Sequence, residues 1–198
     1  MIYMYKKVEN KKIEVLKNAG FTVVETLVAI AILTLSIAGT FTAVQKGLQS
    51  STYAKDQIVA FNLIQEGMEF IRNKRDENAL RNIGGQGNNW LTGLSDIAGD
   101  PCFYGRTCTI DSYTEVVTNY PGGAGTSPVL NVQTSTGLLG YTSGAGWVPT
   151  SFKREIQFQE VLPAVVPPRE VNVIITISWT DRGVDRSLQI IQTLFNRQ

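Results

Sequence analysis

One apolar stretch constrains this chain more than any other feature. Residues 21–44 read FTVVETLVAIAILTLSIAGTFTAV, and Glu25 is the only charged residue among these 24 positions. As a helix this stretch would be about 36 Å long, which is enough to cross a hydrocarbon layer of roughly 30 Å. We therefore expect residues 21–44 to form a transmembrane helix.

The charges around this stretch predict its orientation. Residues 1–20 contain five lysines and two glutamates, a net charge of +3, whereas both signs are mixed after the stretch. Because lysine and arginine accumulate on the cytoplasmic side of membrane proteins, we expect residues 1–20 in the cytoplasm and the bulk of the chain outside. A secretory signal peptide fits less well, because its apolar core has about 7–15 residues and a small-residue cleavage site follows it.

Glu25 is the feature that a plain signal anchor would leave unexplained. A carboxylate at the centre of a membrane costs about 2.5–3.5 kcal/mol on insertion scales, and less near the interface. An ionisable residue in such a segment is therefore a functional candidate whose partner has to be found.

The residues around Glu25 carry a family resemblance. The sequence Gly20-Phe21-Thr22-Val23-Val24-Glu25-Thr26-Leu27, behind a short basic leader, resembles the class III signal of type IV pilins and pseudopilins. The resemblance is strong over residues 15–50 and weak beyond them. It implies a prepilin that a prepilin peptidase cleaves after Gly20, with methylation of the new N-terminus at Phe21. It also implies that Glu25 pairs with the N-terminal amine of a neighbouring subunit during assembly.

The helix is expected to continue beyond the membrane. No proline occurs before Pro101, and apolar residues recur at helical spacing at Ile58, Phe61, Ile64, Met68 and Ile71. We expect one helix from about residue 21 to residue 80, whose second half, residues 45–81, is amphipathic. Packing of this stripe on a sheet is the favoured interpretation, and a coiled-coil partner is the alternative.

Residues 82–198 are expected to form a loop-rich antiparallel β part. Residues 82–101 are rich in glycine and asparagine, with Trp90 and Leu91 as anchors on the core. Apolar residues alternate with polar ones over 152–160, 171–179 and 184–194, and residues 180–183 read as a turn. Together with the helix, this pattern predicts an α+β, pilin-like fold in which Trp179 belongs to the core or the sheet edge.

Cys102 and Cys108 are the only cysteines. Two cysteines this close in a segment outside the membrane favour a disulfide, although free thiols remain the alternative. The pair lies in the middle of the chain, whereas many type IV pilins close a C-terminal loop with theirs.

The composition argues against several classes of function. There is no histidine, which excludes Ser-His-Asp triads and histidine metal ligands. The 18 basic and 17 acidic residues nearly balance, so nucleic acid is not an expected partner. Asp111 and Glu115 are a weak candidate for a calcium site, and residues 84–87 lack the lysine of a phosphate-binding loop. We expect no catalytic residue, no metal and no cofactor.

Two function classes remain. The first is a structural subunit, minor rather than major, of a type IV pilus-like filament or a type II secretion pseudopilus. Its partners would be the prepilin peptidase, other pilin or pseudopilin subunits, an inner-membrane assembly platform and membrane lipid. The second is a membrane-anchored extracellular binding or adhesin domain that does not polymerise. Cleavage between Gly20 and Phe21 would separate the two.

Overall fold

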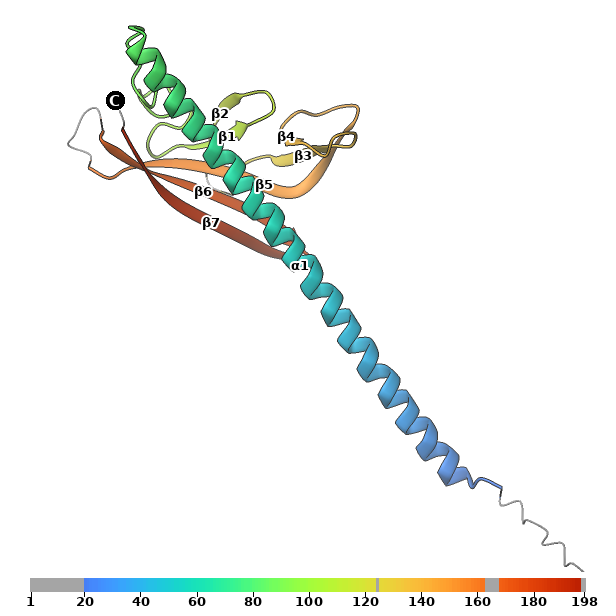
Figure 1. Ribbon diagram of the computed structural model, residues 1–198. Helices are drawn as coiled ribbons and strands as arrows, with labels where there is room; N and C mark the ends of the chain where they lie inside the picture. The colour runs from blue at the N-terminus through green and yellow to red at the C-terminus, as the bar shows by residue number, and fades with distance from the viewer. Residues whose placement is uncertain (1–19, 124, 163–167, 197–198) are drawn as a thin grey trace, which may run out of the picture. The chain divides into compact units, whose positions relative to one another are not determined.

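The computed structural model of the chain describes residues 20–123, 125–162 and 168–196. Within them it has one long helix, α1 (Val23–Ile83), followed by strands (Figure 1). The chain divides into two compact units, residues 1–49 and residues 50–198, and α1 contributes to both. The α+β class expected from the sequence is confirmed. The expected basic leader lies outside the described residues, except for Gly20.

The strands of the second unit form one antiparallel sheet. They are β1 (Thr107–Asp111), β2 (Val116–Tyr120), β3 (Val129–Gln133), β4 (Leu139–Gly140), β5 (Trp147–Glu160), β6 (Glu170–Asp181) and β7 (Val184–Phe195). The long strand β5 is the centre of the sheet, since it pairs with β6, with β3 and with β1. The strands predicted over 152–160, 171–179 and 184–194 are confirmed. Strand β5 begins earlier than predicted, because residues 147–149 pair with β3.

A tight turn fixes the register of the hairpin between β6 and β7. Arg182 and Gly183 have φ angles of 51° and 81°, and Asp181 pairs directly with Val184 on either side of them. Two central residues with positive φ are the geometry of the hairpin turn that matches the natural twist of strands. The predicted turn is therefore present, but it is two residues long and the strands run to its edges.

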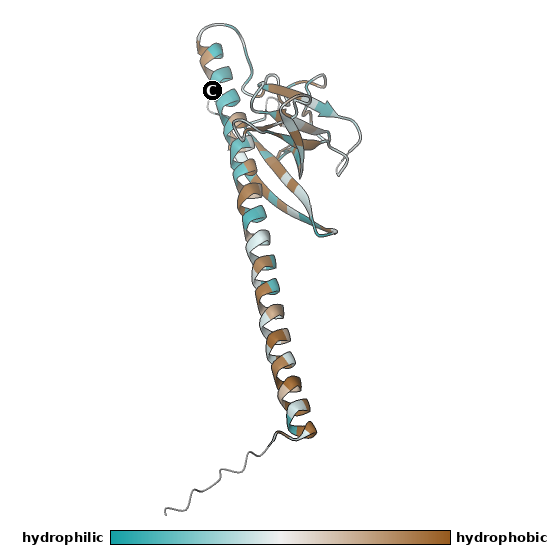
Figure 2. Cartoon of the chain, turned by 90° about the vertical axis from the view of Figure 1, so that its right-hand side faces the viewer, coloured by the Kyte–Doolittle hydropathy of each residue, from teal (hydrophilic) through white to brown (hydrophobic). Residues whose placement is uncertain are grey.

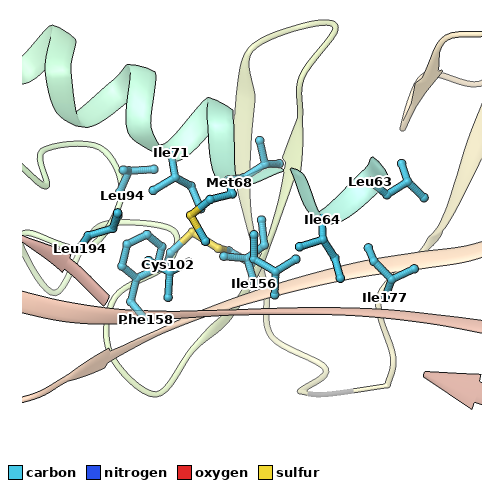
Figure 3. Close-up of a cluster of buried hydrophobic side chains, with 14 of the residues drawn as sticks. Leu63, Ile64, Met68, Ile71, Leu94, Cys102, Ile156, Phe158, Ile177 and Leu194 are labelled. Atoms are coloured by element: carbon cyan, nitrogen blue, oxygen red, sulfur yellow. A yellow bond between two sulfur atoms is a disulfide. The ribbon is translucent and has the colours of Figure 1, made fainter. Parts of the chain in front are cut away.

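The core of the second unit lies between α1 and the inner face of the sheet. Strand β6 alternates buried and partly exposed residues along most of its length, so that its buried side chains face one side. In Figure 1 the strands β5, β6 and β7 cross the C-terminal part of α1, and Figure 3 shows the side chains that meet there. The labelled residues include Ile64, Met68 and Ile71 from the helix and Ile156, Phe158 and Ile177 from the sheet, all at most 4% exposed.

The predicted apolar stripe of the helix was partly wrong. Ile64, Met68 and Ile71 are buried as expected, but Ile58 is 63% exposed and Phe61 is 44% exposed. The buried face instead continues through small residues, with Ala60 and Gly67 among its members. Since each residue turns the helix by about 100°, a face centred on Ala60 leaves Ile58 on the opposite side.

Small residues take these positions because the helix lies close to the sheet. A Cβ atom added at Gly67 would come within 3.4 Å of Ile175 Cδ1 and 3.5 Å of Arg154 Cδ. These distances correspond to van der Waals contact, so there is little room for a larger side chain. The helix therefore packs closely on the sheet at Gly67, a position that a search for large apolar residues does not find.

The long connection after α1 is anchored to this core. Trp90, Leu91 and Leu94 are at most 1% exposed, which confirms the prediction for the first two. The Trp90 indole Nε1–H donates to the carbonyl of Pro168 (3.0 Å), and Asn78 Nδ2 donates to the carbonyl of Thr92 (2.9 Å). Trp179 is also buried, as expected.

A buried arginine joins the helix to the sheet. Arg154 on β5 is 0% exposed and occupies the inner face between Phe152 and Ile156. Its Nη1 donates to the carbonyl of Leu63 (3.2 Å) and lies 3.3 Å from Glu66 Oε1, and its Nη2 donates to the carbonyl of Ile110. One guanidinium thus links α1, β5 and β1, and its planar array of donors suits it to several acceptors at once.

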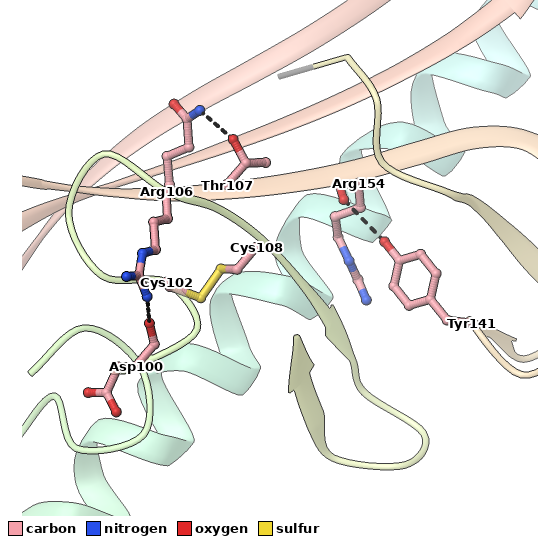
Figure 4. The surroundings of a disulfide bond; sticks show 8 residues. Asp100, Cys102, Arg106, Thr107, Cys108, Tyr141 and Arg154 are labelled. Atoms are coloured by element: carbon pink, nitrogen blue, oxygen red, sulfur yellow. Dashed lines mark hydrogen bonds between the residues drawn. A yellow bond between two sulfur atoms is a disulfide. The ribbon is translucent and has the colours of Figure 1, made fainter. Parts of the chain in front are cut away.

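Arg154 also holds a partly buried tyrosine through its backbone carbonyl. The hydroxyl of Tyr141 donates to the Arg154 carbonyl at 3.1 Å (Figure 4). Burial raises the pKa of Tyr141 to about 12, which keeps this hydroxyl protonated and able to donate. The segment after β4 is thereby attached to the centre of the sheet.

Removal of the Arg154 side chain should destabilise the second unit strongly. Arg154→Ala leaves a cavity and several buried acceptors without their donor, so we expect the free energy of unfolding to fall by about 3–5 kcal/mol. Denaturant titration of the detergent-solubilised chain, followed by tryptophan fluorescence, measures this loss. Lys153→Ala changes the neighbouring residue on the opposite face and should cost less than about 1 kcal/mol. Equal losses in the two variants would contradict the role given to Arg154.

Candidate functional site

Thr22 determines where α1 begins. Its carbonyl accepts the first helical hydrogen bond, from the Thr26 N–H at 3.1 Å, and its Oγ1 accepts from the Glu25 N–H at 3.2 Å. This is the arrangement of an N-cap residue, whose side chain satisfies a backbone donor that the helix leaves unpaired. Gly20 and Phe21 consequently lie before the helix, in irregular and exposed backbone.

Sequence reasoning did not single out Thr22. The signal was present, because Thr22-Val23-Val24-Glu25 has the Thr-x-x-Glu spacing of a capping box. Glu25 falls in the first turn of α1, and its side chain is exposed. A carboxylate is favoured in that turn, since the N-terminal end of the helix carries partial positive charge.

The first half of α1 exposes an uninterrupted apolar surface. In Figure 2 this part of the helix is mostly brown, and its large side chains are more than half exposed, with Leu27, Ile32, Leu35 and Phe41 each more than 60% exposed. Among the described residues α1 is the one helix whose length and composition would allow it to cross a membrane, and none of the relevant window is buried within the chain. This helix suggests membrane anchoring of the chain, with its C-terminal part outside.

The hydroxyl groups in this half of α1 have acceptors within the helix. Thr26 Oγ1 donates to the carbonyl of Val23 at 2.8 Å, Ser36 Oγ donates to Ile32 at 2.8 Å, and Thr34, Thr40 and Thr42 make similar bonds. A polar group in lipid must be satisfied within the protein, because there is no water to bond it. The threonines and serines are therefore compatible with an apolar surrounding.

Comparison with known families assigns this region. Residues 15–41 match the model of the prokaryotic N-terminal methylation motif, which is found in type IV pilins and pseudopilins. The chain carries a prepilin-type signal. This signal spans the junction of Gly20 and Phe21, the cap at Thr22 and the carboxylate of Glu25, and it confirms the resemblance seen in the sequence. No curated protein and no solved structure matches the chain.

A prepilin-type signal has consequences for the partners of the chain. It implies processing by a prepilin peptidase and assembly with other pilin subunits. Because the matched region ends within the apolar half of α1, the signal concerns the processing and anchoring of the chain and not the sheet of the second unit.

A disulfide joins the connection after α1 to the sheet. Cys102 and Cys108 are bonded, with their Cα atoms 5.1 Å apart, and both are 0% exposed (Figure 4). Cys108 lies on β1 opposite Asn119 of β2 and Ile156 of β5, while the Cys102 N–H donates to the carbonyl of Leu94. The bond thus fastens the long loop to the core, and closing such a short loop is worth about 2 kcal/mol in the chain-entropy account.

Asp111 and Glu115, the weak candidates for a calcium site, have different surroundings in the structure. The Asp111 carboxylate accepts from the N–H groups of Tyr113, Thr114 and Tyr141, at 2.9–3.2 Å. Glu115 instead lines a groove beside the helix with Lys74 and Glu77. Within the described residues no group of three or more histidine, cysteine, aspartate or glutamate side chains could hold a metal ion.

The glycine-rich and basic segments at the end of α1 also have structural partners. The Gly84 N–H donates to the carbonyl of Leu80, and Gly85 has a φ of 80°, which is the usual way in which a helix ends. The basic side chains nearby pair with acids on the helix, since Lys74 lies 3.0 Å from Glu77 and Arg75 lies 2.8 Å from Asp76.

The burial of both cysteines predicts how the disulfide behaves. In the folded chain a water-soluble reductant should not reach the bond, so maleimide should label no thiol after brief reduction under native conditions. The same treatment in denaturant should expose two thiols. Intact-mass measurement counts the labels, and two labels on the native, fully folded protein would contradict a buried disulfide.

Proposed function

We propose that this chain is a structural subunit, minor rather than major, of a type IV pilus-like filament or a type II secretion pseudopilus. It is made as a prepilin, cleaved between Gly20 and Phe21 and methylated on the new amine of Phe21. The observation that carries this proposal is the prepilin-type signal at residues 15–41, at the start of a helix whose apolar half is left uncovered by the part of the chain that the structure describes.

The position of the junction supports cleavage. Gly20 and Phe21 precede the helix, and the Phe21 side chain is 80% exposed. Cleavage there removes a leader with a net charge of +3 and leaves the apolar segment on the product. The mature subunit therefore remains in the cytoplasmic membrane, with the second unit outside, until it is drawn into an extracellular or periplasmic filament.

Glu25 is the proposed assembly residue. Its carboxylate lies in the first turn of an apolar helix, and a charge in such a surrounding needs an opposite charge to offset its desolvation. In a filament the methylated amine of Phe21 on a neighbouring subunit would supply it. The partners in this process are the prepilin peptidase, other pilin or pseudopilin subunits and an assembly platform in the inner membrane.

Two features support a minor subunit. The disulfide lies in the middle of the chain and fastens the loop after α1, whereas many type IV pilins close a C-terminal loop with theirs. The connection between α1 and β1 is also long and rich in glycine. Such departures suit a subunit that occupies a special position in the filament.

Processing should depend on a small residue at position 20. A Cβ atom added at Gly20 meets nothing within 4 Å, so the chain itself has room for a larger residue. A bulky side chain should obstruct the peptidase instead, and Gly20→Val should therefore accumulate as the full-length form in the membrane. Intact mass of the membrane-extracted protein measures cleavage, with Gly20→Ala as the smaller control.

Normal cleavage of Gly20→Val would overturn the assignment of the processing site. Cleavage of the natural sequence without any recovery in filaments would favour the anchored binding domain over the filament subunit.

Glu25 should matter for assembly and little for folding. Glu25→Ala removes a charge that is costly in a membrane, so insertion should be unchanged or slightly better. Glu25→Gln removes the same charge and keeps the shape of the side chain. Both variants should be cleaved and folded, yet be depleted from sheared filaments relative to the membrane pool. Incorporation of both at the natural level would refute the role given to Glu25.

A further inference from the structure

The start of α1 lies close to the bond that the proposed processing cleaves. The helix begins at Val23, and the Gly20–Phe21 peptide bond lies just before its N-cap residue, Thr22. Two contacts define this boundary: the Glu25 N–H donates to Thr22 Oγ1, and the Thr26 N–H donates to the Thr22 carbonyl. The start of the helix and the proposed cleavage site therefore both lie within residues 20–23, only two residues apart.

We propose that Thr22 is a positioning residue for processing, because its hydroxyl ends the helix and keeps the Gly20–Phe21 bond in open backbone. This inference rests on the proposed function. A protease acts on a peptide bond whose carbonyl can be reached, and a helix encloses its carbonyls in hydrogen bonds along its axis. The Gly20–Phe21 bond lies just outside the cap, so a protease can reach its carbonyl without unfolding the helix.

Helix geometry shows what the cap prevents. The first N–H groups of a helix have no acceptor within the helix itself. Without the Thr22 hydroxyl, these groups would find acceptors if the helix grew toward the leader by one turn. In that extended helix the N–H of Val24 would bond the carbonyl of Gly20, because helical bonds join residue i to residue i−4. That carbonyl is the one that hydrolysis attacks.

The cap and the signal are independent observations. The cap is a set of hydrogen bonds in the structure, and the signal is a match of residues 15–41 to a motif that marks a peptidase substrate. Together they predict that residue 22 is selected for its ability to cap and not for its shape. Serine and asparagine cap as well as or better than threonine, and alanine does not cap.

The test compares cleavage of the full-length chain by purified prepilin peptidase in liposomes. Thr22→Ala removes the cap and favours helix, whereas Thr22→Ser and Thr22→Asn keep an acceptor oxygen with different shapes. We expect kcat/KM to fall by up to about fivefold for Thr22→Ala and to stay unchanged for the other two. The loss should appear in KM with kcat retained, since fewer substrate molecules have the open conformation.

A second measurement reports the conformation without the peptidase. The carbonyl carbon of Gly20, labelled with ¹³C, should shift toward its helical NMR position in Thr22→Ala and stay unshifted in Thr22→Ser. An unshifted signal and unchanged cleavage in Thr22→Ala would overturn the inference. Equal slowing of all three variants would also overturn it, because it would mean that the peptidase contacts threonine itself. Absence of cleavage in the natural sequence would instead remove the proposed function.

Discussion

The apolar surface on the first half of α1 is the constraint on which the organisation of this chain depends. Side chains such as Leu35 and Phe41 are each more than 60% exposed, and no other element among the described residues covers them. Each square ångström of such surface left in water costs about 25 cal/mol. The first unit therefore requires lipid or the helices of other subunits, whereas the second unit has its own core.

That core depends on contact between a helix and a sheet at close range. Ala60 and Gly67 leave room on the face of α1 that packs on the sheet, and Arg154 from β5 fills the space beside Gly67. Its guanidinium donates to the helix and to strand β1. A buried charge is tolerated only with such partners. The disulfide between Cys102 and Cys108 adds a covalent link on the same side of the sheet, so the loop after α1 is held by packing and by a bond.

Much of this arrangement could be predicted from the sequence, and the errors have identifiable causes. The long helix and the strands of the C-terminal third followed from periodicity, which depends on burial of one face. The stripe at Ile58 and Phe61 was misplaced because part of the helix face that packs on the sheet is formed by alanine and glycine. These residues do not stand out in a pattern of hydrophobicity. Arg154 alternates with apolar residues in the sequence, but its partners Leu63 and Ile110 are distant in the chain, so no local pattern could reveal the link. The N-cap at Thr22 could have been predicted from the Thr-x-x-Glu spacing between Thr22 and Glu25.

The hydroxyl groups of the first half of α1 affect how a subunit could leave a membrane. Each of these hydroxyls donates to a backbone carbonyl of its own helix, so none of them depends on a lipid headgroup or a neighbour for its hydrogen bond. The residues are Thr26, Thr34, Ser36, Thr40 and Thr42. Rotation or sliding of the helix breaks none of these bonds. Transfer of the helix from lipid to a bundle of similar helices would exchange apolar contacts with lipid for apolar contacts with helices, so the energy change of this exchange alone should be small. The direction of such a transfer has to come from the few groups that do change partner. Glu25 is the only charged side chain in residues 21–44.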